Sequence, residues 1–345
     1  MTIKLVSLPL AFAAATLLAP AIAQAQTPAY KVAKTITVGG DGAWDYVIPD
    51  TVGHRLFIGR QNRIMVVDMS SGKVLGEIGG LNAAHGVALD YATGHGFATS
   101  GADSTVVMFD LKTLKPLGRT TAADDADAII YDPASKRVYT FNGDANSASI
   151  IDPVTGKRVG TIPLGGKPEY GATDGAGKLY ANIADKGEIA EIDAAQGKVT
   201  HRWSVKPCTE PTGIAIDLAH HRLFSGCRNK TLAVSDLTNR KLVTTLPIGG
   251  TVDGNAFDPA TQNVFSSNGD GTLTVIHEDS PDAYRVVQTL ATVPSAKTMG
   301  FDPQTHKLYL VSAKFGPVPK DSTAANPRRR PRVLPGTFTL LVVDR

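Results

Sequence analysis

The hydrophobic pattern of this chain repeats at nearly regular intervals. Short runs that end in an aromatic residue, such as HRLF and KRVY, follow one another at spacings of 40 to 44 residues. The aromatic residues are Phe57, Phe97, Tyr139, Tyr180, Phe224, Phe265 and Tyr309. A fixed period in this range is typical of repeat architectures, so the chain is predicted to contain seven equivalent units.

Each unit carries the pattern of β-strands and turns. An aspartate precedes the aromatic residue by seven positions, or by six in the fourth unit; these are Asp50, Asp90, Asp132, Asp174, Asp217, Asp258 and Asp302. The apolar runs are four to eight residues long, alternate with small or polar residues, and are separated by Asp-Pro, Thr-Gly-Lys or Asn-Gly-Asp. This pattern indicates strands rather than helices. Each unit is predicted to be a four-stranded antiparallel sheet, with strands a to d.

The two ends of the chain complete one another. The seventh unit stops after its strand c, at TFTLLVVDR, and the run YKVAKTITVGG at residues 30–40 can supply the missing strand d. One sheet cannot bury both of its faces alone, so seven sheets pack radially and close a ring. A capped solenoid has the same period but leaves the matching ends unexplained. The predicted fold class is all-β: a seven-bladed β-propeller, closed by the N-terminal strand.

Residues 1–25 have the pattern of a secretory signal peptide. Lys4 precedes an apolar stretch from Leu5 to Pro20, and Ala23 and Ala25 fit a small-x-small cleavage site. A membrane anchor would need about 20 apolar residues and a stop-transfer flank. We therefore expect cleavage after Ala25, export to the periplasm or the medium, and one propeller domain over residues 26–345. This domain is expected to be a monomer without a membrane span.

Charge and cysteine content narrow the class further. Loss of Lys4 with the signal lowers the formal net charge from +3 to +2. This balance does not provide the basic face of a duplex-DNA-binding protein. Cys208 and Cys227, on one face of the fifth unit, are predicted to form a disulfide in an oxidising compartment. Two unlinked buried thiols are the alternative.

The candidate site lies where the chain enters strand a, at the face that we call the channel mouth. The residues five positions before each repeated aspartate should converge there; they are Asp45, His85, Asp127, Glu169, Thr212, Asp253 and Lys297. Glu210, in CTEPTG, is expected to reach the same face. Crowded carboxylates repel unless a cation or a basic ligand group compensates them. The alternative is that turns simply favour Asp, Glu and Thr.

Four of these residues could hold a divalent cation such as calcium, zinc or copper; they are Asp45, His85, Glu169 and Asp253. One histidine with oxygen ligands suits a hard or borderline cation better than a structural zinc. The other clustered histidines fall in the turn between strands a and b, at the opposite face. They are predicted to be surface residues: His54, His95, His220, His221 and His306.

The last unit contains a proline- and arginine-rich insertion at residues 316–336. It carries Arg328, Arg329, Arg330 and Arg332, and it replaces the turn between strands b and c. It should emerge over the channel mouth as a lid or docking arm, since long loops are often functional. An arginine cluster there could face the acidic mouth or an anionic partner. A solvated basic loop is an equal alternative.

The units RVYTFNGDANSASIIDPVTGKRVGTI and KLYANIADKGEIAEIDAAQGKV resemble the YVTN-repeat, YncE-like family of secreted seven-bladed propellers. The resemblance covers essentially the whole mature chain and implies fold and export. It also implies single-stranded DNA binding, although only Trp44, Tyr46 and Tyr170 offer aromatic rings near the mouth.

The sequence favours a periplasmic binding or interaction protein whose mouth takes a small polar ligand, a metal or a protein partner. The alternative is a metal-assisted hydrolase or lyase of the lactonase type, in which a cation polarises a carbonyl and a carboxylate or His85 moves a proton. The chain has no nucleophile motif, P-loop or dinucleotide fingerprint. The sequence therefore assigns no catalytic residue.

Overall fold

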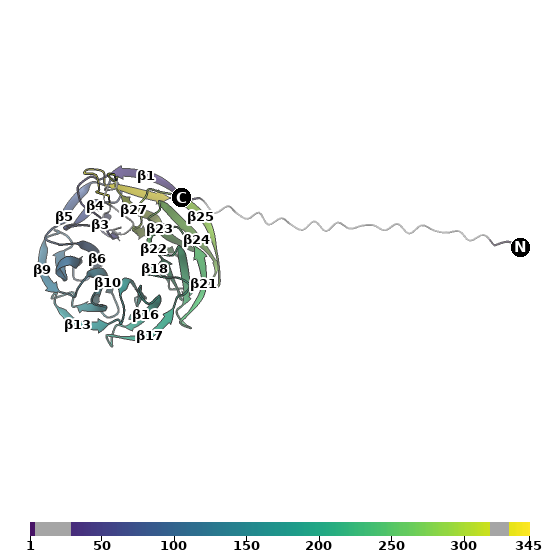
Figure 1. The fold of residues 1–345 in the computed structure, drawn as a ribbon, viewed down its shortest axis with the longest axis horizontal. Coiled ribbons are helices and arrows are strands. Elements are labelled where there is room, and N and C mark those ends of the chain that lie inside the picture. The colour runs from purple at the N-terminus through teal and green to yellow at the C-terminus, as the bar shows by residue number, and fades with distance from the viewer. Residues whose placement is uncertain (4–28, 318–330) are drawn as a thin grey trace.

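The computed structural model describes residues 1–3, 29–317 and 331–345, and seven sheets surround one central axis (Figure 1). Each sheet has four antiparallel strands. In the described residues a single 3₁₀ turn, Gly101–Asp103, interrupts the β-structure. The predicted all-β, seven-bladed propeller is confirmed.

The strands follow one another from the axis outward, as strands a to d of each blade. The first three blades are β2 (Val47–Asp50), β3 (Arg55–Arg60), β4 (Arg63–Asp68) and β5 (Val74–Ile78); β6 (Ala84–Asp90), β7 (His95–Ser100), β8 (Thr105–Asp110) and β9 (Pro116–Thr121); β10 (Ala126–Asp132), β11 (Arg137–Asn142), β12 (Ser147–Ile151) and β13 (Arg158–Pro163). The next three are β14 (Pro168–Thr173), β15 (Lys178–Ile183), β16 (Glu188–Asp193) and β17 (Lys198–Ser204); β18 (Pro211–Asp217), β19 (Arg222–Cys227), β20 (Thr231–Asp236) and β21 (Lys241–Pro247); β22 (Val252–Asp258), β23 (Asn263–Asn268), β24 (Thr272–Ser280) and β25 (Ala283–Ala291).

The seventh blade joins the two ends of the chain. It consists of β26 (Met299–Asp302), β27 (Lys307–Ser312), β28 (Thr339–Asp344) and β1 (Lys31–Thr37). The β1–β28 register runs from Lys31 opposite Asp344 to Thr37 opposite Thr339, and Figure 1 shows purple β1 beside the yellow end of the chain. The predicted closure is confirmed, and hydrogen bonds replace what would otherwise be two free strand edges.

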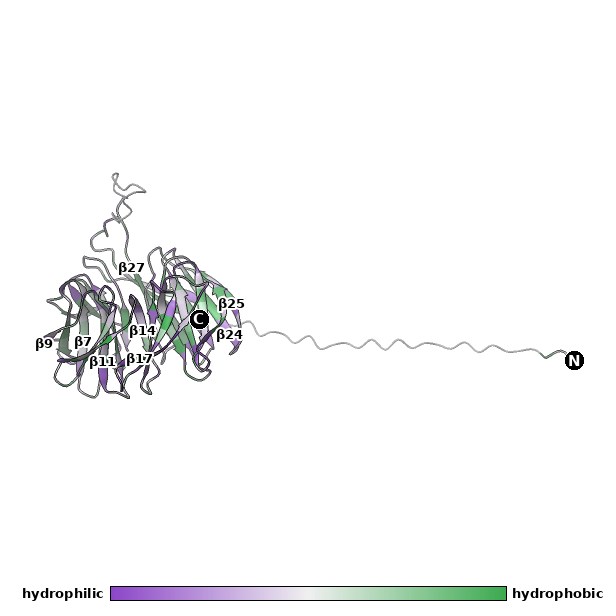
Figure 2. Cartoon of the chain, turned by 60° about the horizontal axis from the view of Figure 1, so that its bottom comes forward, coloured by the Kyte–Doolittle hydropathy of each residue, from purple (hydrophilic) through white to green (hydrophobic). Residues whose placement is uncertain are grey.

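The core lies between the blades. In β3, Leu56 and Ile58 pack against the seventh blade, whereas Phe57 points the other way and meets Phe109 of the second blade at 5.7 Å between ring centroids. Both faces of an inner strand are therefore buried, and apolar residues lie in the interior of the ring in Figure 2. The outer β1 has alternating, mostly exposed side chains. Burial of apolar surface between blades is the main source of stability.

The two cysteines form the predicted disulfide. Cys208, in the loop entering β18, is bonded to Cys227 at the end of β19, with 5.6 Å between their Cα atoms. Both are fully buried. The bond fixes the entry loop of the fifth blade to its second strand.

The insertion of the last blade begins and ends with a short antiparallel pairing. Phe315 pairs with Val333, and the amide of Gly316 donates a hydrogen bond to the carbonyl oxygen of Arg332 at 2.8 Å. The side chain of Arg332 is exposed. The other predicted lid arginines, Arg328, Arg329 and Arg330, lie outside the described residues. Of the helices in the described part of the chain, none is long and apolar enough to cross a membrane.

Candidate functional site

β-Bulges position the side chains at the channel mouth. The register of β6 against β7 shifts between Ala84 and Val87, around His85, and β10 has the same shift around Asp127. Similar shifts surround Glu169, Thr212 and Asp253. A bulge bends the strand and changes the direction of its side chains. In each of these five blades, a bulge near the start of strand a therefore changes the direction of one side chain of the predicted mouth.

Polar side chains of neighbouring blades support these bulges. The hydroxyl of Thr99, in β7, donates a hydrogen bond to the carbonyl oxygen of Asp127 at 2.6 Å, and the side-chain amide of Asn182, in β15, donates to that of Thr212 at 2.9 Å. Both donors are fully buried. Backbone oxygens that leave the ladder at a bulge still need a partner. A side chain of one blade thus stabilises the bulge in the next blade by a hydrogen bond.

Three blades contribute to a cluster at the mouth that we call the His85 cluster: Asp45, His85 and Asp127. Nδ1 of His85 lies 2.6 Å from Oδ2 of Asp45 and 3.3 Å from Oδ1 of Asp127. Burial lowers the pKa of His85, but the hydrogen bond to Asp45 and the charge of Asp127 outweigh it and raise the pKa to about 9. His85 is therefore a cation between two acids at neutral pH.

Asp127 is the least compensated acid of this cluster. Its Oδ1 is buried and takes part in no hydrogen bond of normal geometry. Burial, and then the charge of Asp45, raise the pKa of Asp127 well above its usual value, while His85 opposes the shift. The position thus favours either a proton or an additional positive group.

The other side of the mouth contains a second charged group. Nζ of Lys297 forms an ion pair with Oδ2 of Asp253. Burial still raises the pKa of Asp253 although Lys297 lowers it. Burial also raises the pKa of Glu169, against the charge of Arg228. Three carboxyl groups of the mouth thus have raised pKa values.

Two tyrosines from different repeats meet near these carboxylates. Tyr46 precedes the first blade and Tyr170 lies in the fourth, yet their rings meet edge-on at 4.9 Å between centroids. Burial raises the pKa of both, and the charges of Asp45, Asp127 and Asp253 add to the shift. The hydroxyl groups therefore stay protonated beside the carboxylates.

Two residues of the predicted mouth have other surroundings. Thr212 is buried, and its hydroxyl lies 2.9 Å from the carbonyl oxygen of Val252, to which it donates, because the bulge of β18 turns it toward the next blade. Glu210 is exposed and lies 3.7 Å from Arg228. Neither residue is part of the His85 cluster.

Of the four predicted metal ligands, Asp45 and His85 are in contact. The second acid beside His85 is Asp127, which was not among the four. These three side chains, from adjacent blades, offer ligand atoms within 4.8 Å of one another. Glu169 belongs to the fourth blade and Asp253 to the sixth, and Asp253 pairs with Lys297. Ring position alone therefore did not identify which side chains touch.

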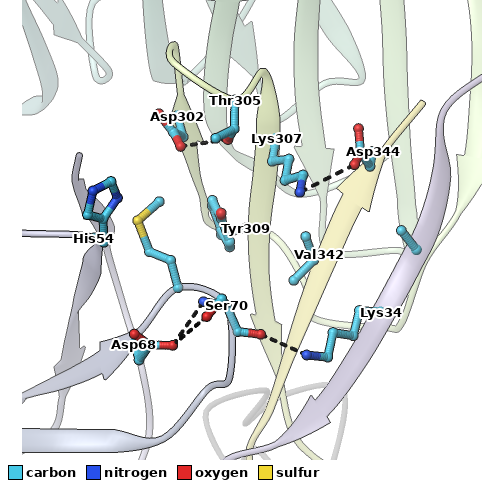
Figure 3. A pocket seen from close by; sticks show the side chains of 12 residues that line it. Lys34, His54, Asp68, Ser70, Asp302, Thr305, Lys307, Tyr309, Val342 and Asp344 are labelled. Atoms are coloured by element: carbon cyan, nitrogen blue, oxygen red, sulfur yellow. Dashed lines mark hydrogen bonds and ion pairs between the residues drawn. The ribbon is translucent and has the colours of Figure 1, made fainter.

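A cavity of about 580 Å³ lies at the seam between the last and first blades (Figure 3). It adjoins the turns at the far ends of strand a, opposite the mouth. Its polar groups largely bind one another: Lys34 donates to the carbonyl oxygen of Ser70 at 2.7 Å, and Lys307 lies 3.6 Å from Asp344. This pairing makes it a weaker candidate than the mouth.

Comparison with solved structures identifies the architecture. The hydrazine synthase of Kuenenia stuttgartiensis matches with a TM-score of 0.68 at 16% identity, over 79% of this chain and 92% of that chain. The structure of U3-55K gives a TM-score of 0.73 at 10% identity, over 91% and 99% of the two chains. The WD40 repeats of RRP9 give 0.74 at 10% identity, over 92% and 99%. The fold is a seven-bladed β-propeller.

These identities establish the fold alone. No protein-family model matches the chain, and no curated protein is significantly similar to it in sequence. The finer resemblance to YncE-like proteins is not established by these matches. Propellers of this kind commonly serve as binding and interaction scaffolds.

Proposed function

We propose that this protein is an exported binding protein that holds a small, positively charged polar ligand at the channel mouth. The observation that supports it is the group of partly buried carboxyl groups there. Asp127, Glu169 and Asp253 all have raised pKa values because burial penalises their charge. A positively charged ligand would stabilise the ionised carboxylates and so offset that penalty. Its attraction to them would be stronger than in bulk water because the site is partly desolvated.

The arrangement also supports selectivity for a compact ligand. The rings of Tyr46 and Tyr170 contact each other, and beyond the effect of burial the carboxylates of Asp45, Asp127 and Asp253 lie close enough for their charges to raise the pKa values of both tyrosines. Their neutral hydroxyl groups add hydrogen-bonding capacity beside the carboxylates. Export rests on the signal pattern of residues 1–25, and together these features support a periplasmic or secreted binding role.

The test uses calorimetric titration of the mature protein with methylammonium, trimethylammonium, guanidinium and putrescine, each against a neutral compound of similar size. At least one cation should bind measurably at pH 7, and the variant Asp127→Asn should bind it about tenfold more weakly, equivalent to about 1.4 kcal/mol. The matched control is Asp110→Asn, in an exposed turn at the opposite face. Equal binding of cations and neutral compounds, or no binding at all, refutes the proposal.

A second candidate is metal-assisted hydrolysis of a lactone or similar ester. It is favoured by the ligand atoms of Asp45, His85 and Asp127, which lie within 4.8 Å of one another. A divalent ion there would polarise a carbonyl group. Hydrolysis of a lactone panel that depends on added zinc, manganese or calcium and is lost in His85→Gln would establish it. Absence of turnover with every ion would exclude it in favour of binding.

The structure gives less support to single-stranded DNA binding. Trp44 packs against Phe315 and Phe338, with centroid distances of 5.9 and 5.7 Å, and Tyr46 packs on Tyr170. Rings that already contact one another do not form a row on which successive bases can stack.

A further inference from the structure

A second cluster of ionisable side chains lies at the opposite end of the ring, between the fifth and sixth blades. Asp217 ends β18, His220 follows it in the turn, and Glu278 comes from β24 of the next blade. Nδ1 of His220 lies 2.8 Å from Oδ2 of Asp217 and 3.1 Å from Oε1 of Glu278. Ligand atoms of all three lie within 4.8 Å of one another.

Glu278 departs from the pattern of the repeat. Its amide donates to the carbonyl oxygen of Gln262 at 2.8 Å, the residue before strand b of its blade. The same backbone bond is made by Met69, Leu111, Ala194 and Leu237 in other blades, and those side chains are apolar and buried. An acid at a position that holds a buried apolar residue in these four blades needs a partner for its charge.

His220 departs from the repeat independently. The residue three positions after the repeated aspartate is Thr93, Thr261 or Thr305 in other blades. Each of those hydroxyl groups donates a hydrogen bond to its own aspartate, at 2.6 to 2.9 Å. In the fifth blade an imidazole takes this place and reaches Glu278 as well. His220 in the fifth blade and Glu278 in the sixth, each of which differs from the repeat pattern, are therefore in contact with each other.

The two carboxylates of the cluster are buried, and within the described part of the chain only one of their four oxygens, Oδ1 of Asp217, accepts a hydrogen bond, from the amide of Ala219 at 2.9 Å. Asp217 is 1% exposed and Glu278 is 3% exposed. Oδ2 of Asp217, Nδ1 of His220 and both carboxylate oxygens of Glu278 form no hydrogen bond of normal geometry with the described residues. Such atoms are costly to bury unless an ion or a proton joins them.

The neighbouring polar groups are engaged elsewhere. Arg222 donates from Nε to the carbonyl oxygen of Pro281 at 2.8 Å and from Nη2 to Asp282 at 3.0 Å. Tyr284, which adjoins Glu278, donates its hydroxyl to the same carbonyl oxygen at 2.9 Å. His220 is the basic side chain that directly contacts both carboxylates.

We propose that Asp217, His220 and Glu278 form a binding site for a first-row divalent metal ion, with zinc the best match. One imidazole nitrogen and two carboxylate oxygens are ligands that zinc accepts. Zinc bonds of about 2.0 to 2.1 Å in a tetrahedron place ligand atoms about 3.3 Å apart. The observed separations of 2.8 and 3.1 Å need only small adjustments to reach that geometry.

The site is open on one side. The side chain of His220 is 37% exposed, so an ion can enter past it and keep a water molecule as its fourth ligand. Because Asp217 and Glu278 belong to different blades, the ion would connect the fifth blade to the sixth. The site is separate from the His85 cluster, which lies at the other end of strand a.

The test measures zinc binding to full-length mature protein without a polyhistidine tag, after treatment with a chelator. The parent protein in this experiment already carries His85→Gln, which disables the mouth cluster as a competing metal site. Each variant adds one further substitution to this parent. The protein should bind one zinc with a dissociation constant of about 10 μM or lower and unfold at a higher temperature with zinc present. Adding Glu278→Leu, the residue found at Leu111 and Leu237, should abolish both effects.

The second variant, His220→Thr, restores the residue of Thr261 and provides an independent check. It should weaken zinc binding at least tenfold, while its metal-free unfolding temperature stays within a few degrees of the parent. Cobalt substituted for zinc should give visible absorption bands in the parent that both variants lack. Zinc binding of equal strength in parent and variants, or none in the parent, would overturn the proposal and leave a shared proton as the partner of the two carboxylates.

Discussion

The protonation of His85 should make the stability of the propeller depend on pH. The pKa of this imidazole is raised from 6.5 to about 9 in the folded protein. A raised pKa means that the folded state binds the proton more tightly than the unfolded chain does. The resulting stabilisation is complete below pH 6.5 and disappears as the pH rises through 9.

The magnitude follows from the same pKa difference. One pKa unit corresponds to about 1.4 kcal/mol, so the change from 6.5 to about 9 contributes about 3 kcal/mol to the free energy of unfolding at pH 6. The raised pKa of Asp127 acts in the same direction, because that carboxyl also loses a proton held by the folded state as the pH rises. Both groups therefore lose stabilisation as the pH rises, Asp127 from its ordinary pKa of 3.8 upward and His85 between 6.5 and about 9.

The variant His85→Gln isolates the contribution of the imidazole. Glutamine keeps a hydrogen-bond donor near Asp45 but cannot take up a proton. Urea denaturation followed by the fluorescence of Trp44 and Trp203, at several pH values from 6 to 10, gives the free energy of unfolding. The variant should be less stable by about 3 kcal/mol at pH 6, and the difference should vanish by pH 10.

A matched control is His54→Gln, in the exposed turn at the opposite face. It should follow the parent at every pH. A difference between His85→Gln and the parent that stays constant from pH 6 to pH 10 would refute the reasoning, because it would show that His85 contributes by packing alone.

Three other substitutions test how the ring is held together. Replacing Cys208 and Cys227 by serine removes a link across 19 residues and should lower the free energy of unfolding by about 3 kcal/mol in urea without reductant; no change would contradict it. Arg60→Lys should lower the free energy of unfolding, measured by calorimetry, by about 2 kcal/mol. The guanidinium group of Arg60 binds the backbone carbonyls of residues 41–43, and its carbon lies 3.6 Å from the centre of the Phe338 ring; a lysine cannot make both interactions. Thr212→Val should cost about 1 kcal/mol of stability yet leave cation binding at the mouth unchanged, and a tenfold loss of binding would contradict its structural role.

Much of the architecture can be predicted from the sequence, because the alternation within each strand and the incomplete last repeat are both visible in short stretches of the chain. The alternating runs predict the strands, and the incomplete seventh unit predicts that residues 30–40 pair with the C-terminal strand; β1 and β28 confirm it. The disulfide follows from the places of Cys208 and Cys227 on one repeat.

The contacts of the site are less predictable because they depend on bulges and on distances across the ring. Equivalent positions hold His85, which meets two acids, and Thr212, which turns into the neighbouring blade. The sequence predicted His220 as a surface residue, and its side chain is 37% exposed, but its contact with Glu278 was not predicted. Aligning the sixth repeat with the others at the position of Met69, Leu111, Ala194 and Leu237 would have revealed Glu278 among apolar residues.

Because the first strand of the fold completes the last blade, synthesis of this protein cannot produce a finished ring until the final residues of the chain are available. Until then the nascent molecule is an open array whose terminal sheets present unpaired edges, a form prone to association with other chains. A stop codon at position 339 would remove β28 and Arg345, seven residues in all, and leave β1 without its partner, so a very small truncation should prevent maturation of the whole molecule.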